Sequence, residues 1–423
     1  MSTGLTPDLK DLSVLARLFA PVAAEPAIGI AVSGGPDSLA LMLLAETWAR
    51  ATPNPPAIFI YSLDHGLRPE ARAEVDMVLK IATDLGLTAR GLVWDGNKPE
   101  TGISEASRQA RYRLIGQAMR EDGVKLLLTA HHRMDQAETV LMRLAHGSGV
   151  EGLKAMTPFS NVEGISIFRP LLDVEPASLA AIVEQAGLKA AQDPSNADSA
   201  YERVRWRKLL PLLAEEGLDS AALSRFATRM AEADNALAQM ADAAFKELVR
   251  LDGFGAASLP DAALRTLSPA IGRRVLGRVL NIVGGRQKPR ALGQIERLYD
   301  QIIQNNLHRA ATLLGAVIRL KGEMLTISRE PGRALPEEQA LPPQGELIWD
   351  ERFRITNLSD ISLLAGATDF MPRHRLEDVL GFKVTTPAEA IRTAPLVRDA
   401  DGGVLALGGW SFDDRVRVEL LID

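Results

Sequence analysis

A short glycine-containing segment between two apolar stretches most strongly limits the folds open to this chain. Residues 28–32 are apolar, residues 33–38 read Ser-Gly-Gly-Pro-Asp-Ser, and residues 39–49 follow a helical pattern. A strand, a glycine loop and a helix in this order direct backbone N–H groups to the start of the helix, where anions bind. Pro36 suits the first helical turn, where its missing N–H costs nothing. The segment therefore predicts a strand–helix unit with a phosphate site.

The residues of this loop also exclude one common phosphate-binding motif. A Walker-type loop has four residues between its glycines and ends in Gly-Lys-Ser/Thr, and residues 33–38 have neither feature. The loop is similar instead to the SGGxDS pyrophosphate loop of the N-type ATP pyrophosphatases, which cut ATP between its α- and β-phosphates. The alternative interpretation is a glycine turn that closes an ordinary strand–helix unit.

Strands and helices are expected to alternate along the first half of the chain. Further strands are predicted at 57–63, 90–94, 124–130 and 165–168, and helices at 7–19, 69–85, 104–119, 134–144 and 176–185. This alternation predicts an α/β fold with a doubly wound, mostly parallel sheet. Ligands bind at the carboxyl ends of the strands of such sheets, where residues 33–38, 64–68 and 131–135 fall.

Composition removes several chemistries and locations. The 423 residues include no cysteine, so the chain forms no disulfide, Cys-based metal site, iron–sulfur cluster or thiolate nucleophile. The first residues do not have the basic and then apolar pattern of a signal peptide. No uninterrupted apolar stretch approaches the about 20 residues that a membrane span needs. We therefore expect a cytoplasmic protein that does not bind a membrane.

Positive charge is concentrated in one part of an acidic chain. The net charge is −6, yet residues 262–322, here called the basic segment, contain eleven Lys and Arg against two Asp and Glu. A basic block in an acidic protein is typical of a local phosphate-binding surface. The alternative is a solvated helical surface that is rich in arginine.

Two carboxylates follow a pair of histidines at the end of a predicted strand. Asp135 and Glu138 are three residues apart at a helix start, so they share one face of the helix. Asp135 could act as a helix cap, but a pair of carboxylates beside an anion site also suits a cationic substrate group. His131 and His132 would point to opposite faces of an extended chain, which argues against a two-histidine metal site.

Arginines recur in two further segments. Arg108 and Arg111 share one face of a predicted helix. Arg203, Arg205 and Arg207 alternate, so some would face inward on a strand, whereas on a helix they would span most of a turn. The sequence leaves both conformations open.

Six segments together resemble the bacterial tRNA(Ile)-lysidine synthetase family of N-type ATP pyrophosphatases. They are SGGPDS (33–38), LDHGLRPEA (63–71), EASRQARY (105–112), TAHHRMDQAETVLMRLAHGSGVEGL (129–153), RPLL (169–172) and QDPSN (192–196). The resemblance is dense from about residue 28 to residue 211, and its most specific part is the His-His-x-x-Asp-Gln-x-Glu-Thr element. The family commonly has an Arg-Asn pair after the last of these motifs, where this chain has Arg203-Val204.

The resemblance implies an adenine-nucleotide α-hydrolase-like fold and a two-step reaction. ATP would adenylate O2 of the wobble cytidine in the CAU anticodon of tRNA(Ile), with release of pyrophosphate. The ε-amine of free lysine would then attack C2 and expel AMP, which gives lysidine. Mg²⁺ is expected with ATP, and Asp37 is the candidate ligand.

The same resemblance implies roles for individual residues. The ATP and pyrophosphate site would comprise Ser33, Gly34, Gly35, Pro36, Asp37, Ser38, His65 and His131. The catalytic residues would be Asp37, Arg111, Asp135, Glu138, Arg203 and Arg205, with Asp135 and Glu138 binding lysine. The lysine amine, with a pKa of about 10.4, needs a base, and either carboxylate could serve. The tRNA-binding residues would be Arg273, Arg274, Arg278, Arg286, Lys288 and Arg290.

The expected organisation has four parts. A catalytic domain at 1–215 precedes a helical linker and a basic, mainly helical tRNA-binding domain at 216–330, a linker at 331–345 and a small β-rich domain at 346–423. The oligomeric state is left open. The alternatives are another ATP pyrophosphatase of this class, such as a GMP or NAD synthetase, and a non-catalytic RNA-binding relative.

Overall fold

The chain divides into two compact units, Met1–Asp234 and Asn235–Asp423. The computed structural model describes residues 8–96, 98–99, 101–191, 198–285, 292–332, 335–368 and 371–422. Helix α9 (Ser220–Leu248) crosses the boundary between the units. Each unit has a hydrophobic core of its own. The finer division at residues 215, 330 and 345 stays a prediction.

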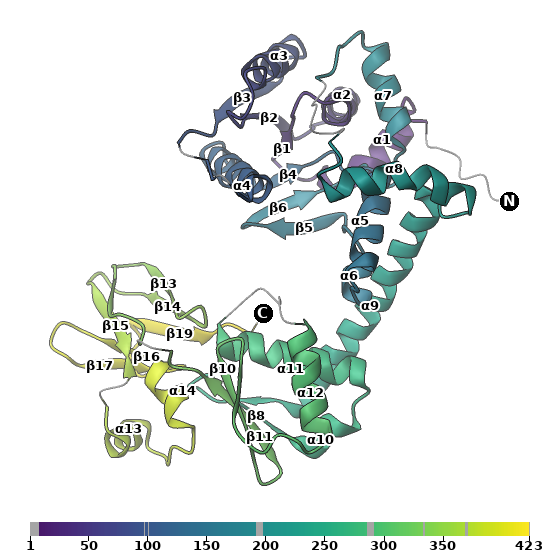
Figure 1. Cartoon of the computed structure of the whole chain (residues 1–423). Helices are drawn as coiled ribbons and strands as arrows, with labels where there is room; N and C mark the ends of the chain where they lie inside the picture. Colours follow the sequence, from purple (N-terminus) through teal and green to yellow (C-terminus); the bar gives the residue numbers. More distant parts are fainter. Residues whose placement is uncertain are drawn as a thin grey trace. The chain divides into compact units, whose positions relative to one another are not determined.

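The first unit is built on a mostly parallel sheet, as predicted (Figure 1). Its six strands have the order β3-β2-β1-β4-β6-β5. The neighbours from β3 to β6 pair in parallel, and β5 pairs antiparallel with β6. The strands are β1 (Ala27–Ala31), β2 (Ala57–Asp64), β3 (Thr88–Val93), β4 (Leu126–Leu128), β5 (Phe159–Val162) and β6 (Ile165–Phe168).

Helices cover both faces of this sheet. The helices are α1 (Leu12–Phe19), followed by a 3-10 turn (Ala20–Val22), α2 (Pro36–Ala51), α3 (Ala71–Asp84), α4 (Ile103–Glu121), α5 (Arg133–Ala145), α6 (Val150–Leu153), α7 (Pro176–Gln185) and α8 (Glu202–Glu215). Helices α1, α2, α3 and α7 share one core with the sheet, and α4 packs on the opposite face. Because both faces are covered, the central strands are almost continuously apolar.

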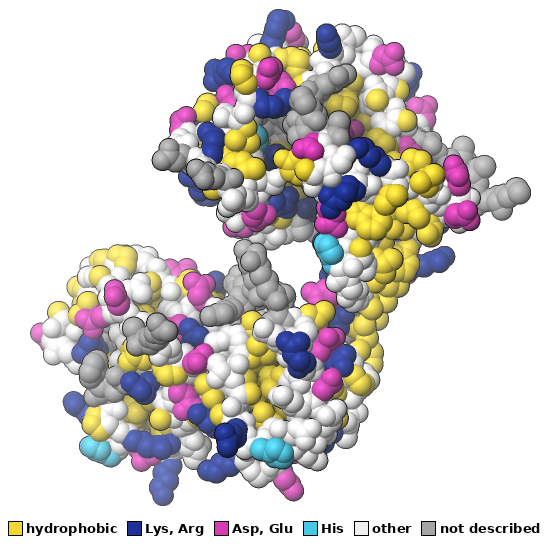
Figure 2. Space-filling model, in the orientation of Figure 1, with side chains coloured by type: hydrophobic (Ala, Val, Ile, Leu, Met, Phe, Trp, Pro, Cys, Tyr) yellow, Lys and Arg dark blue, Asp and Glu magenta, His cyan; other side chains and the backbone are white. Residues whose placement is uncertain are grey.

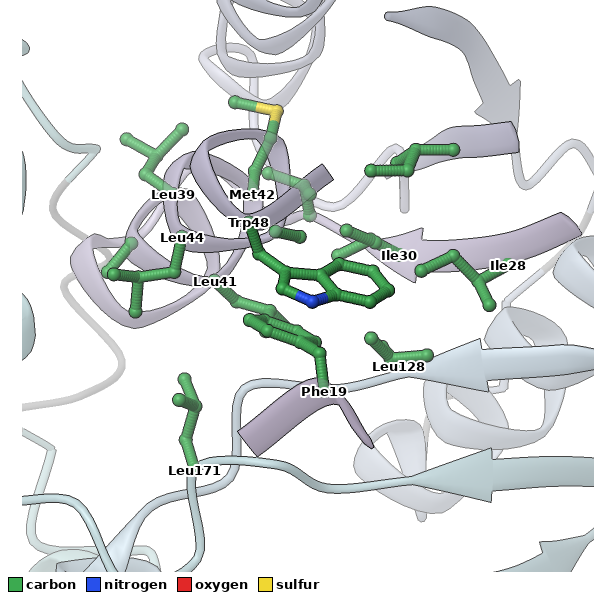
Figure 3. Close-up of a cluster of buried hydrophobic side chains, with 14 of the residues drawn as sticks. Phe19, Ile28, Ile30, Leu39, Leu41, Met42, Leu44, Trp48, Leu128 and Leu171 are labelled. Carbon is green, nitrogen blue, oxygen red and sulfur yellow. The ribbon is translucent and has the colours of Figure 1, made fainter. Parts of the chain in front are cut away.

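Stacked aromatic rings join the first helix to this core. Phe19 of α1 and Trp48 of α2 stack with ring centroids 4.9 Å apart, next to Ile28, Ile30 and Leu128 of the sheet (Figure 3). Burial of side chains of this size stabilises the unit by about 1.5–3 kcal/mol each. Helix α2 is thereby fixed against β1, and the loop between these two elements holds residues 33–38.

The second unit begins with three helices and an antiparallel sheet. The helices are α10 (Asp261–Thr266), α11 (Pro269–Gly284) and α12 (Leu292–Ile303). The sheet has the order β7-β8-β11-β10-β9, from β7 (Arg250–Leu251), β8 (Ala257–Pro260), β9 (Ala311–Leu313), β10 (Ala316–Lys321) and β11 (Met324–Arg329). Strands β10 and β11 form an antiparallel hairpin. The basic segment therefore combines helices with strands.

The rest of the second unit is β-rich, as expected. One antiparallel sheet joins β12 (Gln339–Leu341), β15 (Leu363–Ala367), β16 (Pro395–Arg398), β17 (Val404–Leu407) and β18 (Trp410–Ser411), and a second joins β13 (Glu346–Trp349), β14 (Phe353–Asn357) and β19 (Val416–Leu420). The helices are α13 (Arg373–Leu380) and α14 (Ala388–Thr393). Strand β12 lies within the stretch predicted as a linker. Of the helices described, none is both long enough and apolar enough to cross a membrane.

Candidate active site

The glycine loop connects β1 to α2 with the geometry of an anion site. Gly35 is the N-cap of α2, and Pro36 is its first residue, so the loop ends where helical N–H groups begin. Gly34 has a φ of +88°, which L side chains rarely adopt. A Cβ on Gly34 would also lie 3.2 Å from Met77 Cε and 3.5 Å from Ala191 Cβ. The backbone torsion therefore favours glycine at this position, while the end of the Met77 side chain could shift to make room for a Cβ.

The two serines of the loop have different environments. The Ser38 hydroxyl donates to Gly35 O at 3.0 Å and accepts from Ser33 N at 3.1 Å, and its side chain is buried. Ser33 Oγ lies 3.3 Å from Ser38 Oγ, but Ser33 is exposed. Ser38 therefore shapes the loop from inside, and Ser33 presents its hydroxyl group to solvent.

A reciprocal pair of hydrogen bonds begins helix α5, directly after β4. His132 N donates to Asp135 Oδ2 at 3.0 Å, and Asp135 N donates to His132 Nδ1 at 3.4 Å. This capping box satisfies two N–H groups that a helix start leaves without partners. The capping role considered for Asp135 is thus confirmed, with His132 as the N-cap.

His132 also joins this helix start to the glycine loop. Because Nδ1 accepts from Asp135, the proton of the neutral ring lies on Nε2, which is 3.5 Å from Asp37 Oδ2. Burial lowers the pKa of His132, but the hydrogen bond to Asp37 and the charges of Asp135 and Glu138 outweigh burial and raise it overall. The predicted clusters at 33–38 and 131–135 are therefore in contact. Sequence reasoning missed His132, although its place before a helical Asp was a signal.

His131 has a different set of neighbours. Its Nδ1 lies 2.9 Å from Thr129 Oγ1. Burial lowers the pKa of His131 to about 4, since the attraction of Asp135 is opposed by Arg169, Arg203 and Arg108. His131 is therefore neutral near pH 7. No group of three or more His, Asp or Glu within the described residues could hold a metal ion.

Glu138 is held by two arginines of α8. Its side chain is 0% exposed; Arg207 Nε donates to Oε1 at 2.6 Å, and Arg203 Nε lies 3.0 Å from Oε2. Burial raises the pKa of Glu138, and the contact with Arg207 opposes this rise. Glu138 thus links α5 to α8 in addition to sharing a helix face with Asp135.

The helical conformation of α8 decides between the two arrangements considered for its arginines. Arg203 and Arg207 are four residues apart, so they share the face toward Glu138. Arg205 points elsewhere and donates through Nη1 to Ser199 O at 3.0 Å and Ala200 O at 2.8 Å. The structure therefore brings Arg203 to the site with Arg207, which was not among the predicted catalytic residues, and does not bring Arg205.

A second group of predicted residues meets at the end of β2. His65 Nδ1 lies 2.8 Å from Ser107 Oγ, and His65 Nε2 lies 3.4 Å from Arg111 Nη2. The segment 63–71, which follows β2, is therefore in contact with the segment 105–112 of α4. Arg111 is exposed to solvent. We use "carboxyl edge" for this edge of the first sheet, formed by residues 33–38, 64–68 and 131–138.

The predicted tRNA-binding residues lie in the other unit, and several have acidic partners. Arg273 is 3.4 Å from Glu296 and 3.2 Å from Asp300, and Arg278 is 2.7 Å from Asp242. Basic and acidic side chains are interspersed on the face of this unit seen in Figure 2. Arg286, Lys288 and Arg290 lie outside the described residues, as does the QDPSN motif.

Comparison with known proteins agrees with this geometry. Residues 8–213 match the family model of the PP-loop domain, which makes the chain an ATP-binding protein of the PP-loop class. It is 46% identical over 327 residues to the tRNA(Ile)-lysidine synthase of Rhodopseudomonas palustris, across 75% of this chain and 94% of the relative. For the enzyme of that name from Bradyrhizobium diazoefficiens, the identity is 44%, across 75% of this chain and 93% of the relative.

The chain therefore belongs to the tRNA(Ile)-lysidine synthase family, and it is an enzyme of this type. Neither alternative, another synthetase of the class or a non-catalytic relative, is favoured. Among solved structures, the U34-tRNA thiolase of Methanococcus maripaludis is similar with a TM-score of 0.46 and 16% identity, across 52% of this chain and 77% of the thiolase.

Proposed function

We propose that this protein uses ATP to join lysine to C2 of the wobble cytidine in tRNA(Ile) with a CAU anticodon. The relatives named tRNA(Ile)-lysidine synthase support this reaction, and the PP-loop domain implies the use of ATP. The structural observation that carries the proposal is the contact of His132 with both Asp37 and Asp135. Through this contact, the loop proposed to bind ATP lies next to the carboxylates proposed to bind a cationic nucleophile.

In the first step, cytidine O2 attacks the α-phosphorus of ATP, and the bond to pyrophosphate breaks. Residues 33–38 hold the leaving pyrophosphate through the backbone N–H groups at the start of α2 and the exposed Ser33 hydroxyl. Arg111 and Arg203 neutralise the charge that develops on the α-phosphate. Adenylation converts cytidine O2, a poor leaving group, into the phosphate oxygen of AMP, which leaves readily.

In the second step, lysine approaches the face of α5 that carries Asp135 and Glu138. A carboxylate attracts the lysine ammonium and accepts the proton that the amine must lose before it attacks C2. Asp135 is the more accessible of the two, with 9% exposure against 0% for Glu138. The amine then bonds to C2, and AMP departs.

A magnesium ion fits the carboxyl edge beside Asp37. The carboxylate of Asp37 is 36% exposed and stands in the first turn of α2, next to the phosphate loop. Mg²⁺ in nucleotide sites is commonly held by one or two carboxylates, water and the phosphates themselves, so a larger protein cluster is unnecessary. The ion would offset the charge of the leaving pyrophosphate.

Mass spectrometry of the tRNA tests the reaction directly. After incubation with ATP, Mg²⁺ and lysine, we expect a lysine-sized addition on the wobble cytidine of tRNA(Ile), and none when that cytidine is replaced by uridine. Pyrophosphate release that needs no tRNA but follows GMP or NAD precursors would contradict the proposal. A tRNA substrate also agrees with a cytoplasmic location.

A further inference from the structure

One buried carboxylate is shared by two arginines where α8 packs against α5. The group of Glu138, Arg203 and Arg207 carries one net positive charge, because two guanidinium groups face one carboxylate. Arg207 also interacts electrostatically with Asp135 and with Asp37 of the glycine loop. The excess positive charge therefore lies close to the predicted site of phosphate transfer.

The two arginines do not contact Glu138 in equivalent ways. Arg207 Nε makes a hydrogen bond to Oε1 at 2.6 Å. Arg203 Nε is 3.0 Å from Oε2, yet within the described part of the chain this oxygen has no hydrogen bond. Arg203 makes a longer bond, 3.4 Å, from Nη2 to Thr139 Oγ1. Arg207 thus fixes the carboxylate, and Arg203 is held more loosely beside it.

Apolar contacts hold these helices together independently of the charges. Ala137, Val140 and Leu141 of α5 form a buried cluster with Leu210 of α8. Trp206 and Leu213 of α8 pack against the same cluster. The ion pairs are therefore not needed to explain why α8 docks on α5.

We propose that Arg207 is a positioning residue for adenylation, because it holds Glu138 and thereby leaves Arg203 directed at the α-phosphate. An arginine and a carboxylate alone tend to form a bidentate pair with two parallel hydrogen bonds. With Oε1 engaged by Arg207, Arg203 contacts Glu138 at Oε2, and the two guanidinium groups share the carboxylate. Arg203 then keeps N–H groups available for an anion. The inference rests on the function proposed above.

The test is a double-mutant cycle on the first half of the reaction. We would measure single-turnover pyrophosphate release with ATP and tRNA(Ile), without lysine, for Arg207→Gln, Glu138→Gln and the double variant. Arg207→Gln should lower the rate about 10- to 100-fold, since small misplacement of a catalytic group has effects of this size. The KM for ATP should change less than about twofold, because the loop at 33–38 is untouched. Arg207→Lys should restore part of the rate.

The expected signature is coupling through Glu138. In the Glu138→Gln background, Arg203 has no carboxylate partner there, so a further change of Arg207 should alter the rate less than about threefold. Lys208→Gln is the matched control, because Lys208 is the next residue on α8, is exposed and bonds Ser199 Oγ at 2.8 Å. Its rate should equal that of the wild type. Thermal unfolding of every variant checks that each one is folded.

Three outcomes would overturn the inference. Equal rate losses for Arg207→Gln in both backgrounds would show that Arg207 acts independently of Glu138. A wild-type rate in folded Arg207→Gln would leave only a structural ion pair. Wild-type protein that releases no pyrophosphate with this tRNA would overturn the proposed function, and the role of Arg207 with it.

Discussion

The carboxyl edge of the first unit and the basic segment of the second unit both looked functional in the sequence, yet they differ in how their polar side chains are used. At the carboxyl edge, each pair includes a buried side chain: His132, which contacts Asp37 of α2, is 8% exposed, and Glu138, which contacts Arg203 of α8, is 0% exposed. In the basic segment, arginines pair with acids on helices, and the pairs are more open to solvent, as for Arg273 and Glu296, whose side chains are 33% and 42% exposed.

The difference shows what a count of charges omits. Arg265 pairs with Asp261, Arg278 with Asp242 and Arg319 with Glu389, and all three acids lie outside residues 262–322. The excess positive charge of the basic segment is therefore partly balanced by acids that the sequence window excluded. The glycine loop at 33–38, by contrast, specifies both a backbone conformation and the side chains that it positions.

The largest effect should come from the carboxyl edge. Asp37→Asn removes the charge proposed to hold Mg²⁺ and the partner of His132, so pyrophosphate release should fall about 10²- to 10³-fold. The measurement is the rate at saturating ATP across a Mg²⁺ titration. Glu46→Gln, on the same helix but paired with Arg50, is the control and should keep the wild-type rate. A normal rate in Asp37→Asn would remove the main functional distinction between the two regions.

Asp135→Asn should separate lysine from ATP. Asn retains an oxygen that can cap His132 N, but it lacks the charge for an ammonium group. The KM for lysine should rise about 50-fold, as expected when one partner of a charge pair is removed, and the KM for ATP about threefold or less. Steady-state assays with each substrate varied in turn provide the measurement. The reverse ranking would assign Asp135 to ATP or its metal.

The free energy of unfolding of the first unit should decrease in acid, because burial at the carboxyl edge lowers the pKa of His131. The pKa of His131 is about 4 in the folded protein, against 6.5 for a histidine in the unfolded chain. Below pH 6.5 the unfolded state therefore binds more protons than the folded state. Stability should be unaffected above that pH and fall as the pH drops from 6.5 to 4, by about 2 kcal/mol at pH 5. Urea unfolding at pH 7 and pH 5 should show a smaller loss for His131→Gln. Identical losses in both proteins would contradict the prediction.

The smallest effect is expected in the basic segment. Replacing Arg273, Arg274 and Arg278 with Gln should weaken tRNA binding about two- to fivefold. The plot of the logarithm of the association constant against the logarithm of salt concentration should become less steep, by about one to three units of slope. Filter binding across a salt series provides the measurement. Asp242→Asn is the opposing variant, since it removes the partner of Arg278 and should tighten binding. An unchanged slope would indicate that these arginines are solvated and do not contact tRNA.

Local sequence patterns predicted the first unit well, because each of its strands and helices corresponds to one short stretch of apolar and polar residues. The predicted strand at 165–168 and the predicted helix at 176–185 have these bounds in the structure. The phosphate loop depended on residues 33–38 alone, because two glycines and a proline restrict the backbone there. The sheet of strands β7 to β11 in the second unit depends on pairing of β8 with β11, which are far apart in sequence, and no local pattern encodes that pairing.

Individual site residues were harder to predict, because their roles depend on tertiary partners. The alternation of Arg203, Arg205 and Arg207 fitted a strand as well as a helix, and only the helix of the structure separates Arg205 from the other two. Glu138 shares a face with Asp135, as the spacing predicted, but its full burial follows from the packing of α8. His132 could have been recognised from its place before α5, whereas its contact with Asp37 depends on β1 and β4 lying side by side in the sheet.

The capping box at the start of α5 restricts which side chains evolution can place at position 132. The residue must accept a backbone N–H from Asp135 and, with another atom, donate to the carboxylate of Asp37. Besides histidine, only asparagine and glutamine combine a strong acceptor and an N–H donor on one planar group. Substitutions that only cap the helix, such as Ser or Asp, would remove the contact with the glycine loop, so helix stability and this contact cannot be optimised separately at position 132.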